Sequence, residues 1–91
     1  MEKLIKTRKF NKEKYNFYLK DMIFNNETVY YISCETPSNC FGYPDTILLN
    51  SKNQAYTLHR YLQPWILNKI ELIMLELQQK YIYEDKKQCI Y

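Results

Sequence analysis

The chain is poor in the residues from which most catalytic sites are built, with one glycine and one histidine among its 91 residues. The single Gly42 provides no glycine-rich loop to hold a phosphate or an oxyanion. The lone His59 has no second imidazole as a partner, and any pairing with a cysteine would be a chance arrangement. We therefore expect a non-enzymatic protein without catalytic residues or cofactors, in which His59 is a partly buried helix residue.

The three cysteines, Cys34, Cys40 and Cys89, lack the spacing of a metal site. Structural zinc sites usually present paired ligands roughly two to four residues apart, and no two of these cysteines are so placed. A disulfide between Cys34 and Cys40 is geometrically allowed across a turn, but a reducing compartment disfavours it. We expect no metal, reduced thiols, and Cys34 as a small core residue at the end of a strand.

Long apolar runs are also missing. No segment approaches the roughly 20 apolar residues of a membrane span, and none follows the basic start as in a signal peptide. We expect a cytoplasmic protein, in the host cytoplasm if it is viral, with no membrane partner. The length suits a single domain over 1–91, with strands and a loop over 1–50, helices over 51–83 and a polar tail over 84–91.

Residue usage is biased toward amino acids with AT-rich codons. Phe, Tyr, Met, Ile, Asn and Lys make up 45 of the 91 residues, whereas Gly, Ala, Arg and Pro make up 7. We infer an AT-rich genome, such as that of a low-GC bacterium, its phages or an archaeal virus. The same bias raises the Lys and Tyr counts independently of function, which weakens arguments from those two residue types.

Charge is distributed unevenly along the chain. Residues 1–20 carry seven cations and two anions, residues 21–50 carry four anions and no cation, and residues 51–91 carry six cations and four anions. Such polarity can orient a partner or steer an encounter. Two oppositely charged segments that lie side by side as strands would also neutralise each other.

The first half of the chain predicts β-strands. Tyr15, Phe17 and Leu19 alternate with more polar residues, the period of a half-buried strand, and the other segments are rich in β-branched and aromatic residues. Asn25-Asn26 favours a tight hairpin, because asparagine tolerates positive φ. The predicted strands cover 4–10, 14–24, 28–34 and, as a short fourth strand, 46–50.

The last 40 residues predict two helices. Ser51 and Gln54 have the spacing of a capping box, which favours a first helix from 51 to about Leu62. Pro64 would break that helix and suits the first turn of a second one, over 64–83. The expected fold class is α+β, with an N-terminal antiparallel β-meander of three to four strands followed by two C-terminal helices packed on one sheet face.

The second predicted helix is apolar on two sides. Ile66, Ile70, Ile73, Leu77 and Tyr81 form a narrow core stripe, whereas Trp65, Leu72 and Leu75 fall on the far side among polar residues. A helix of this kind must be covered on both sides. Either the first helix folds back over the far side, or another chain covers it.

Protein binding is the function that these features favour. Tyr and Trp anchor interfaces because they bury a large area with few rotatable bonds and keep a polar tip. We expect binding to a host or partner protein through the acidic loop 33–45 or the far face of the second helix, with self-association into a dimer through that helix as a compatible addition. The candidate protein-binding residues are Tyr31, Glu35, Tyr43, Asp45, Tyr56, Tyr61, Trp65, Leu72 and Leu75.

The chain resembles phage and virus accessory proteins that inhibit host machinery, including anti-defence inhibitors such as anti-CRISPR proteins. The shared features are a short length, residue usage biased toward AT-rich codons, the lack of a catalytic motif and an uneven distribution of charge. The resemblance is one of style and covers no motif. It implies inhibition of a host factor by steric occlusion.

Single-stranded nucleic-acid binding is the alternative. The basic N-terminal strands interleave cations with aromatic residues, a mixture that contacts phosphates and stacks bases. The segment lacks the glycines of the aromatic RNA-recognition strand motif, and binding chiefly through lysine would be nonspecific. The candidate residues for this alternative are Lys6, Arg8, Lys9, Lys12, Lys14, Tyr15 and Phe17.

Overall fold

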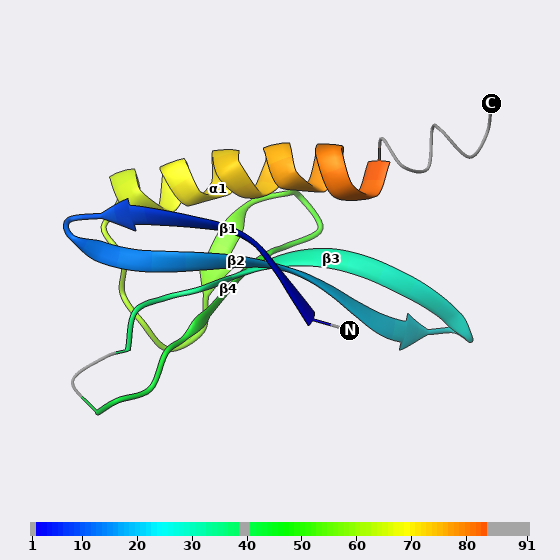
Figure 1. Ribbon diagram of the computed structural model, residues 1–91, viewed down its shortest axis with the longest axis horizontal. Helices are drawn as coiled ribbons and strands as arrows, with labels where there is room; N and C mark the ends of the chain where they lie inside the picture. Colours follow the sequence, from blue (N-terminus) through cyan, green and yellow to red (C-terminus); the bar gives the residue numbers. More distant parts are fainter. Residues whose placement is uncertain (1, 39–40, 84–91) are drawn as a thin grey trace.

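In the computed structural model, which describes residues 2–38 and 41–83, five strands come first along the chain and a helical rod follows (Figure 1). The elements are β1 (Glu2–Phe10), β2 (Glu13–Phe24), β3 (Glu27–Glu35), β4 (Thr46–Leu49), β5 (Ala55–Thr57), α1 (Pro64–Gln78) and the π-helical turn η1 (Gln79–Tyr83). The predicted α+β class is confirmed, with five strands in place of three or four. The predicted polar tail over 84–91 lies outside the described residues.

The strands form one antiparallel meander in the order β1-β2-β3-β4-β5. Two-residue turns join the first three strands: Asn25 and Asn26 have φ of 51° and 63°, and Asn11 and Lys12 have φ of 52° and 66°. Turns with positive φ at both central residues match the right-handed twist of the flanking strands. The predicted Asn25-Asn26 hairpin is therefore confirmed, and the turn at Asn11 is a second one of the same kind.

The predicted first helix, over 51–62, is wrong, because this segment forms a hairpin loop, β5 and a connection to α1. The side-chain oxygen of Asn50 accepts hydrogen bonds from the backbone N–H groups of Lys52 and Gln54, at 2.8 and 3.0 Å. An asparagine that satisfies the amides just after it favours a turn over a helix. Ser51 and Gln54 are thus loop residues, and their capping-box spacing is not used.

The predicted second helix is confirmed over 64–83, as α1 and η1 together. Pro64 occupies the first turn, where its missing N–H costs no helical hydrogen bond. The wider π-helical turn brings residues about five apart to the same side of the helix. Leu77 at the end of α1 and Ile82 in η1 are five residues apart, and both are buried. The wider turn thus keeps the end of the rod packed on the sheet.

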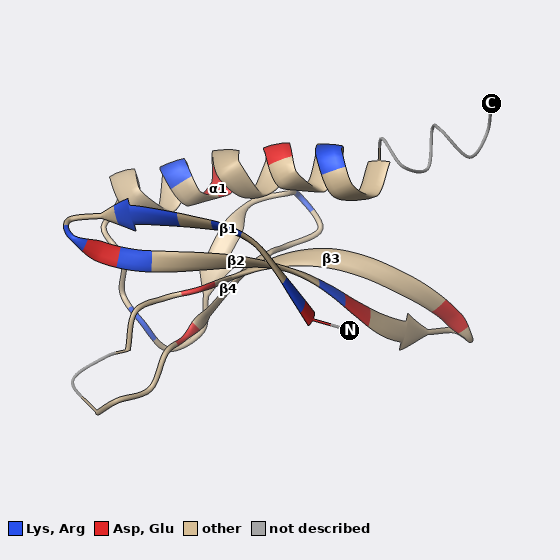
Figure 2. Ribbon diagram, viewed as in Figure 1, with Lys and Arg blue, Asp and Glu red and all other residues tan. Residues whose placement is uncertain are grey.

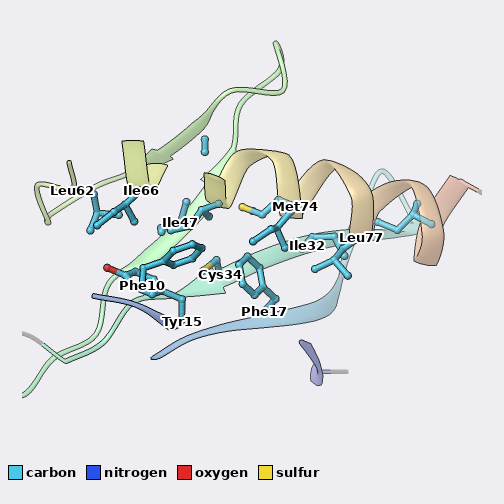
Figure 3. Close-up of a cluster of buried hydrophobic side chains, with 14 residues drawn as sticks. Phe10, Tyr15, Phe17, Ile32, Cys34, Ile47, Leu62, Ile66, Met74 and Leu77 are labelled. Atoms are coloured by element: carbon cyan, nitrogen blue, oxygen red, sulfur yellow. The ribbon is translucent and has the colours of Figure 1, made fainter. Parts of the chain in front are cut away.

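A single core lies between the helix and one face of the sheet (Figure 3). Phe17, Cys34 and Ile47 from three neighbouring strands are fully buried against Ile70 and Met74 of α1. The Cys34 side chain lies in the core, as predicted. Burial raises the pKa of its thiol above the ordinary range. The other core members are Phe10, Tyr15, Ile32, Ala55, Leu62, Ile66, Ile73, Leu77 and Ile82.

The helix covers only the part of the sheet nearest the turn at Asn11. Beyond Leu19 and Ile32 no other described element covers the β2–β3 hairpin, and residues 22–30 are all exposed. The hairpin projects to one end of the molecule, which measures 46 × 24 × 23 Å (Figure 1). The long axis of the molecule is therefore set by a two-stranded ribbon.

Within the described residues, none of the helical segments has both the length and the apolar character needed to cross a membrane.

Paired substitutions on α1 test the placement of the core. Ile70→Ala should lower the free energy of unfolding by about 2–5 kcal/mol, because it leaves a cavity under a fully buried side chain. Leu72→Ala, two residues away and 63% exposed, should change it by less than about 0.5 kcal/mol. Urea unfolding followed by circular dichroism measures both, and equal losses would contradict this orientation of the helix.

Candidate protein-binding surface

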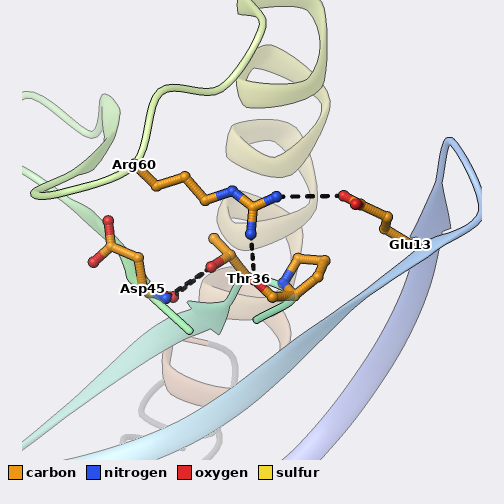
Figure 4. A network of polar contacts seen from close by, with 5 residues as sticks. Glu13, Thr36, Asp45 and Arg60 are labelled. Carbon is orange, nitrogen blue, oxygen red and sulfur yellow. Dashed lines mark hydrogen bonds and ion pairs between the residues drawn. The ribbon is translucent and has the colours of Figure 1, made fainter. Parts of the chain in front are cut away.

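Asp45 joins two loops at the end of the molecule opposite to the hairpin tip. Its carboxylate accepts hydrogen bonds from the Thr57 hydroxyl, from the N–H of His59 at 2.8 Å and from the N–H of Thr46 at 2.8 Å. The same residue's backbone is bonded twice to the Thr36 side chain, since Asp45 N–H donates to Oγ1 at 2.8 Å and Oγ1 donates to the Asp45 carbonyl at 3.1 Å (Figure 4). Asp45 therefore fixes the base of the loop after β3 to the segment after β5.

Arg60 makes a second connection between the same loops. Its guanidinium donates to the carbonyl of Pro37 and lies 3.5 Å from the Glu13 carboxylate on β2 (Figure 4). The ion pair is partly exposed and contributes little to stability by itself. With the bond to Pro37, however, it holds the 58–63 segment against the start of the loop.

Partial burial raises the pKa of Asp45, but the hydrogen bonds from Thr57, His59, Thr46 and Arg60 outweigh this effect and lower it below its ordinary value. The carboxylate is therefore the form that the site stabilises. Its role is structural, because the three donors Thr46, Thr57 and His59 lie on β4, on β5 and in the segment after β5, and one carboxylate holds all three.

Four large apolar side chains stand exposed on the two clamped loops, and we call them the loop surface. Phe41 and Tyr43 belong to the loop after β3, and Leu58 and Tyr61 to the segment after β5. Each is between 69% and 83% exposed. Exposed aromatic and aliphatic residues on a rigid base are typical of protein-binding sites, because little ordering is needed when a partner binds.

Of the predicted site residues, Tyr43 and Tyr61 lie one on each loop of the loop surface, and Asp45 lies at its base. Trp65 and Leu72 lie seven residues apart on the outer side of α1, and both are exposed. The remaining predicted residues, Tyr31 and Glu35 on β3, Tyr56 on β5 and Leu75 on α1, are not part of the loop surface. With no first helix present, the indole and Leu72 have no cover from residues 51–62.

The basic residues of the nucleic-acid alternative lie along β1 and its turn into β2 (Figure 2). Lys9, Lys12 and Lys14 are exposed, as is Arg8, whose guanidinium lies 5.9 Å from the centre of the Phe10 ring. Lys6 is half-buried. The other two candidates, Tyr15 and Phe17, are buried in the core, so their rings present no open face on which a base could stack.

His59 is an exposed loop residue, so its predicted position in a helix is wrong. The described residues contain no group of three or more His, Cys, Asp or Glu side chains arranged to hold a metal ion. Of the cysteines considered for a metal site or a disulfide, Cys34 is buried, and Cys40 and Cys89 lie outside the described residues.

Sequence reasoning missed a second apolar surface, at the projecting end of the β2–β3 hairpin. Met22, Ile23, Phe24, Val29 and Tyr30 are between 40% and 79% exposed there. The available signal was the run of apolar residues next to Asn25-Asn26. In a half-buried strand such residues should alternate with polar ones up to the turn.

Comparisons with protein-family models, with curated proteins and with solved structures found no match to this chain.

Removal of the Asp45 charge tests the loop clamp. Asp45→Asn should lower the free energy of unfolding near pH 7 by about 1–3 kcal/mol, because the amide replaces an acceptor oxygen by a donor. The pKa of Asp45 is lower in the folded protein than in the unfolded chain, where it is about 4. The ionised carboxylate therefore stabilises the fold at pH values above about 4, and this stabilisation is lost as the pH falls through the pKa of the folded state. The difference between wild type and variant in urea unfolding should therefore shrink below about pH 4. A difference that stays constant with pH would contradict the clamp.

Proposed function

We propose that this protein is a non-enzymatic protein-binding module that acts by occluding a surface of a host or partner protein. The observation that carries the proposal is the loop surface. Phe41, Tyr43, Leu58 and Tyr61 expose a large apolar area on two loops that Asp45 and Arg60 tie together. Large exposed apolar side chains that lie near one another are typical of surfaces that bind another protein.

The clamp makes this surface suited to binding. The Asp45 and Arg60 contacts fix both loop bases before any partner arrives, so the entropy lost on association is small. Tyr43 and Tyr61 add hydroxyl groups at the ends of apolar rings, which allows them to anchor at a partly polar interface. Trp65, at the start of α1, is a further exposed aromatic residue close to Tyr61 in the sequence.

Steric occlusion is the mechanism that this arrangement supports. It needs a rigid projecting surface and no reacting groups. In the proposal the target is a host factor, and the protein is a phage, virus or mobile-element accessory protein of the anti-defence kind, acting in the host cytoplasm. The assignment to accessory proteins of this kind is supported by the small size, the AT-rich residue usage and the uneven charge of the chain.

Single-stranded nucleic-acid binding is the second candidate, favoured by the exposed cations of β1 and the turn after it. Since Tyr15 and Phe17 are buried, such binding would depend on phosphate contacts and fall steeply with salt.

One pair of variants separates the two functions. The double variant Tyr43→Ser/Tyr61→Ser removes two exposed rings and leaves the Asp45 hydrogen bonds in place. The charge-reversal variant Lys6→Glu/Arg8→Glu/Lys9→Glu removes the basic strand. Affinity capture from a host lysate, followed by measurement of the purified complex, should show binding weakened by about 700-fold or more in the double variant, since two anchors of about 2 kcal/mol each contribute about 4 kcal/mol.

The charge-reversal variant should keep most of that affinity. Wild-type protein that binds single-stranded oligonucleotides at physiological salt, and loses this binding only on charge reversal, would favour the second candidate and contradict the first. Circular dichroism of both variants controls for folding.

A further inference from the structure

The outer edge of β3 is unpaired over most of its length. β4 pairs with β3 only at Cys34 and Glu35, whereas β2 pairs with β3 from Glu27 to Glu35. No other described strand pairs with residues 27–33 on the side of β4. These residues therefore form an open sheet edge.

The backbone groups that face this edge follow from the hairpin. In a two-residue turn the flanking pair, Phe24 and Glu27, is hydrogen-bonded, and hydrogen-bonded pairs then alternate along the ladder. Thr28, Tyr30 and Ile32 belong to the other pairs. Their N–H and C=O groups therefore point away from β2, toward the open edge.

A groove of about 560 Å³ runs beside this edge, where β4 turns away from β3. Ser33 lines it, is 1% exposed, and its hydroxyl has no hydrogen-bond partner among the described residues. The side-chain oxygen of Gln78, in the same groove, is also buried without a partner there. Buried polar atoms are nearly always paired, so these two indicate a contact that residues 2–38 and 41–83 of a single copy do not make.

The edge also lacks the basic residues and prolines that usually prevent an exposed strand from pairing with another chain. β1, the outer strand on the other side of the sheet, has lysine or arginine at four of its nine positions. Residues 27–33 contain no lysine, arginine or proline, and Glu27 is their only charged residue. A long open edge of aromatic and β-branched residues is a template for another strand.

We propose that this edge pairs with the same edge of a second copy of the chain, antiparallel and about a two-fold axis at Tyr30. In this register Tyr30 lies opposite Tyr30 of the second copy, and Thr28 lies opposite Ile32. All three residues direct backbone donors and acceptors outward, so they form the hydrogen-bonded pairs of the new ladder. The two sheets become one continuous sheet, with an interface that uses the same surface on both copies.

The side chains fit this register. Val29 lies opposite Tyr31 of the second copy, a β-branched and aromatic pair that stabilises neighbouring strands. Glu27 lies opposite Ser33, whose hydroxyl can donate to the incoming carboxylate, and Lys20 lines the same groove. The only charged side chain of the edge therefore lies opposite a buried hydroxyl donor. Glu27 does not lie opposite Glu27 of the second copy.

The register also accounts for the groove. Antiparallel pairing brings the hairpin tip of each copy beside Ile32 and Ser33 of the other, at the point where β4 leaves β3. The exposed Phe24 and Met22 are thereby carried toward the groove of the neighbouring chain. A strand from an unrelated protein could use the same edge, but it would leave this chain's own apolar tip exposed.

Charge substitutions at Tyr30 test both the dimer and its register by sedimentation velocity. Wild type should sediment at twice the 11.2 kDa mass of the chain. Tyr30→Lys and Tyr30→Glu should each weaken dimerisation by at least about tenfold, because like charges meet at the axis. An equimolar mixture of the two should form a heterodimer, since opposite charges then face each other.

Thr28→Lys and Thr28→Glu are the matched controls. Residue 28 lies opposite Ile32 in this register, so mixing these two variants should restore no dimer beyond what each forms alone. Circular dichroism and thermal unfolding verify that all four variants fold. A monomeric wild type, a dimer that persists in Tyr30→Lys, or a Tyr30 mixture that stays monomeric would each overturn the proposal. The loop surface lies at the other end of the molecule, so none of these results bears on the proposed function.

Discussion

One helix packs on a sheet that is longer than the helix can cover, and the rest of the structure depends on this mismatch. The 20 residues of α1 and η1 together extend about 30 Å, whereas the 12 residues of β2 extend about 40 Å. The core is consequently confined to the part of the sheet around Phe17, Cys34 and Ile70. The remainder of the β2–β3 hairpin is held by its own ladder, and its apolar side chains stay in water.

The two ends of the molecule are therefore different in kind. At one end, Asp45 and Arg60 fix two loops that present exposed rings on a rigid base. At the other end, a regular strand offers backbone groups that no described strand pairs, next to a groove in which the buried Ser33 hydroxyl has no partner within residues 2–38 and 41–83. Pairing of two hairpins would place the two loop surfaces at the far ends of a dimer. A target with two equivalent sites could then be bound twice by one assembly.

The sequence was sufficient for the elements whose signals are local. Alternation of Tyr15, Phe17 and Leu19 predicted β2, the asparagine pair predicted its hairpin, and Pro64 predicted the start of the helix. The helix over 51–62 was predicted from an equally local signal and was wrong. There, the Asn50 side chain accepts hydrogen bonds from the amides that follow it, and the long-range hydrogen bonds that Thr57 and His59 donate to the Asp45 carboxylate favour a strand and loop.

Tertiary placement also explains what sequence reasoning missed in the candidate site. Tyr43 and Tyr61 were named as anchors, but their common base was not visible, because Asp45 and Arg60 join segments far apart in the chain. The apolar hairpin tip was read as an ordinary strand. Periodicity reports which residues share a face, and it does not report how far along the strand a helix covers that face.

Amide hydrogen exchange along β3 tests most directly whether the uncovered edge is completed by a second copy. The N–H groups of Thr28, Tyr30 and Ile32 point away from β2, so their protection depends on what lies at the edge. We expect these three amides to exchange at least about tenfold more slowly as the protein concentration rises through the dimerisation range, while the amide of Val29, bonded to β2, changes far less. Three amides that remain unprotected at every concentration would contradict it.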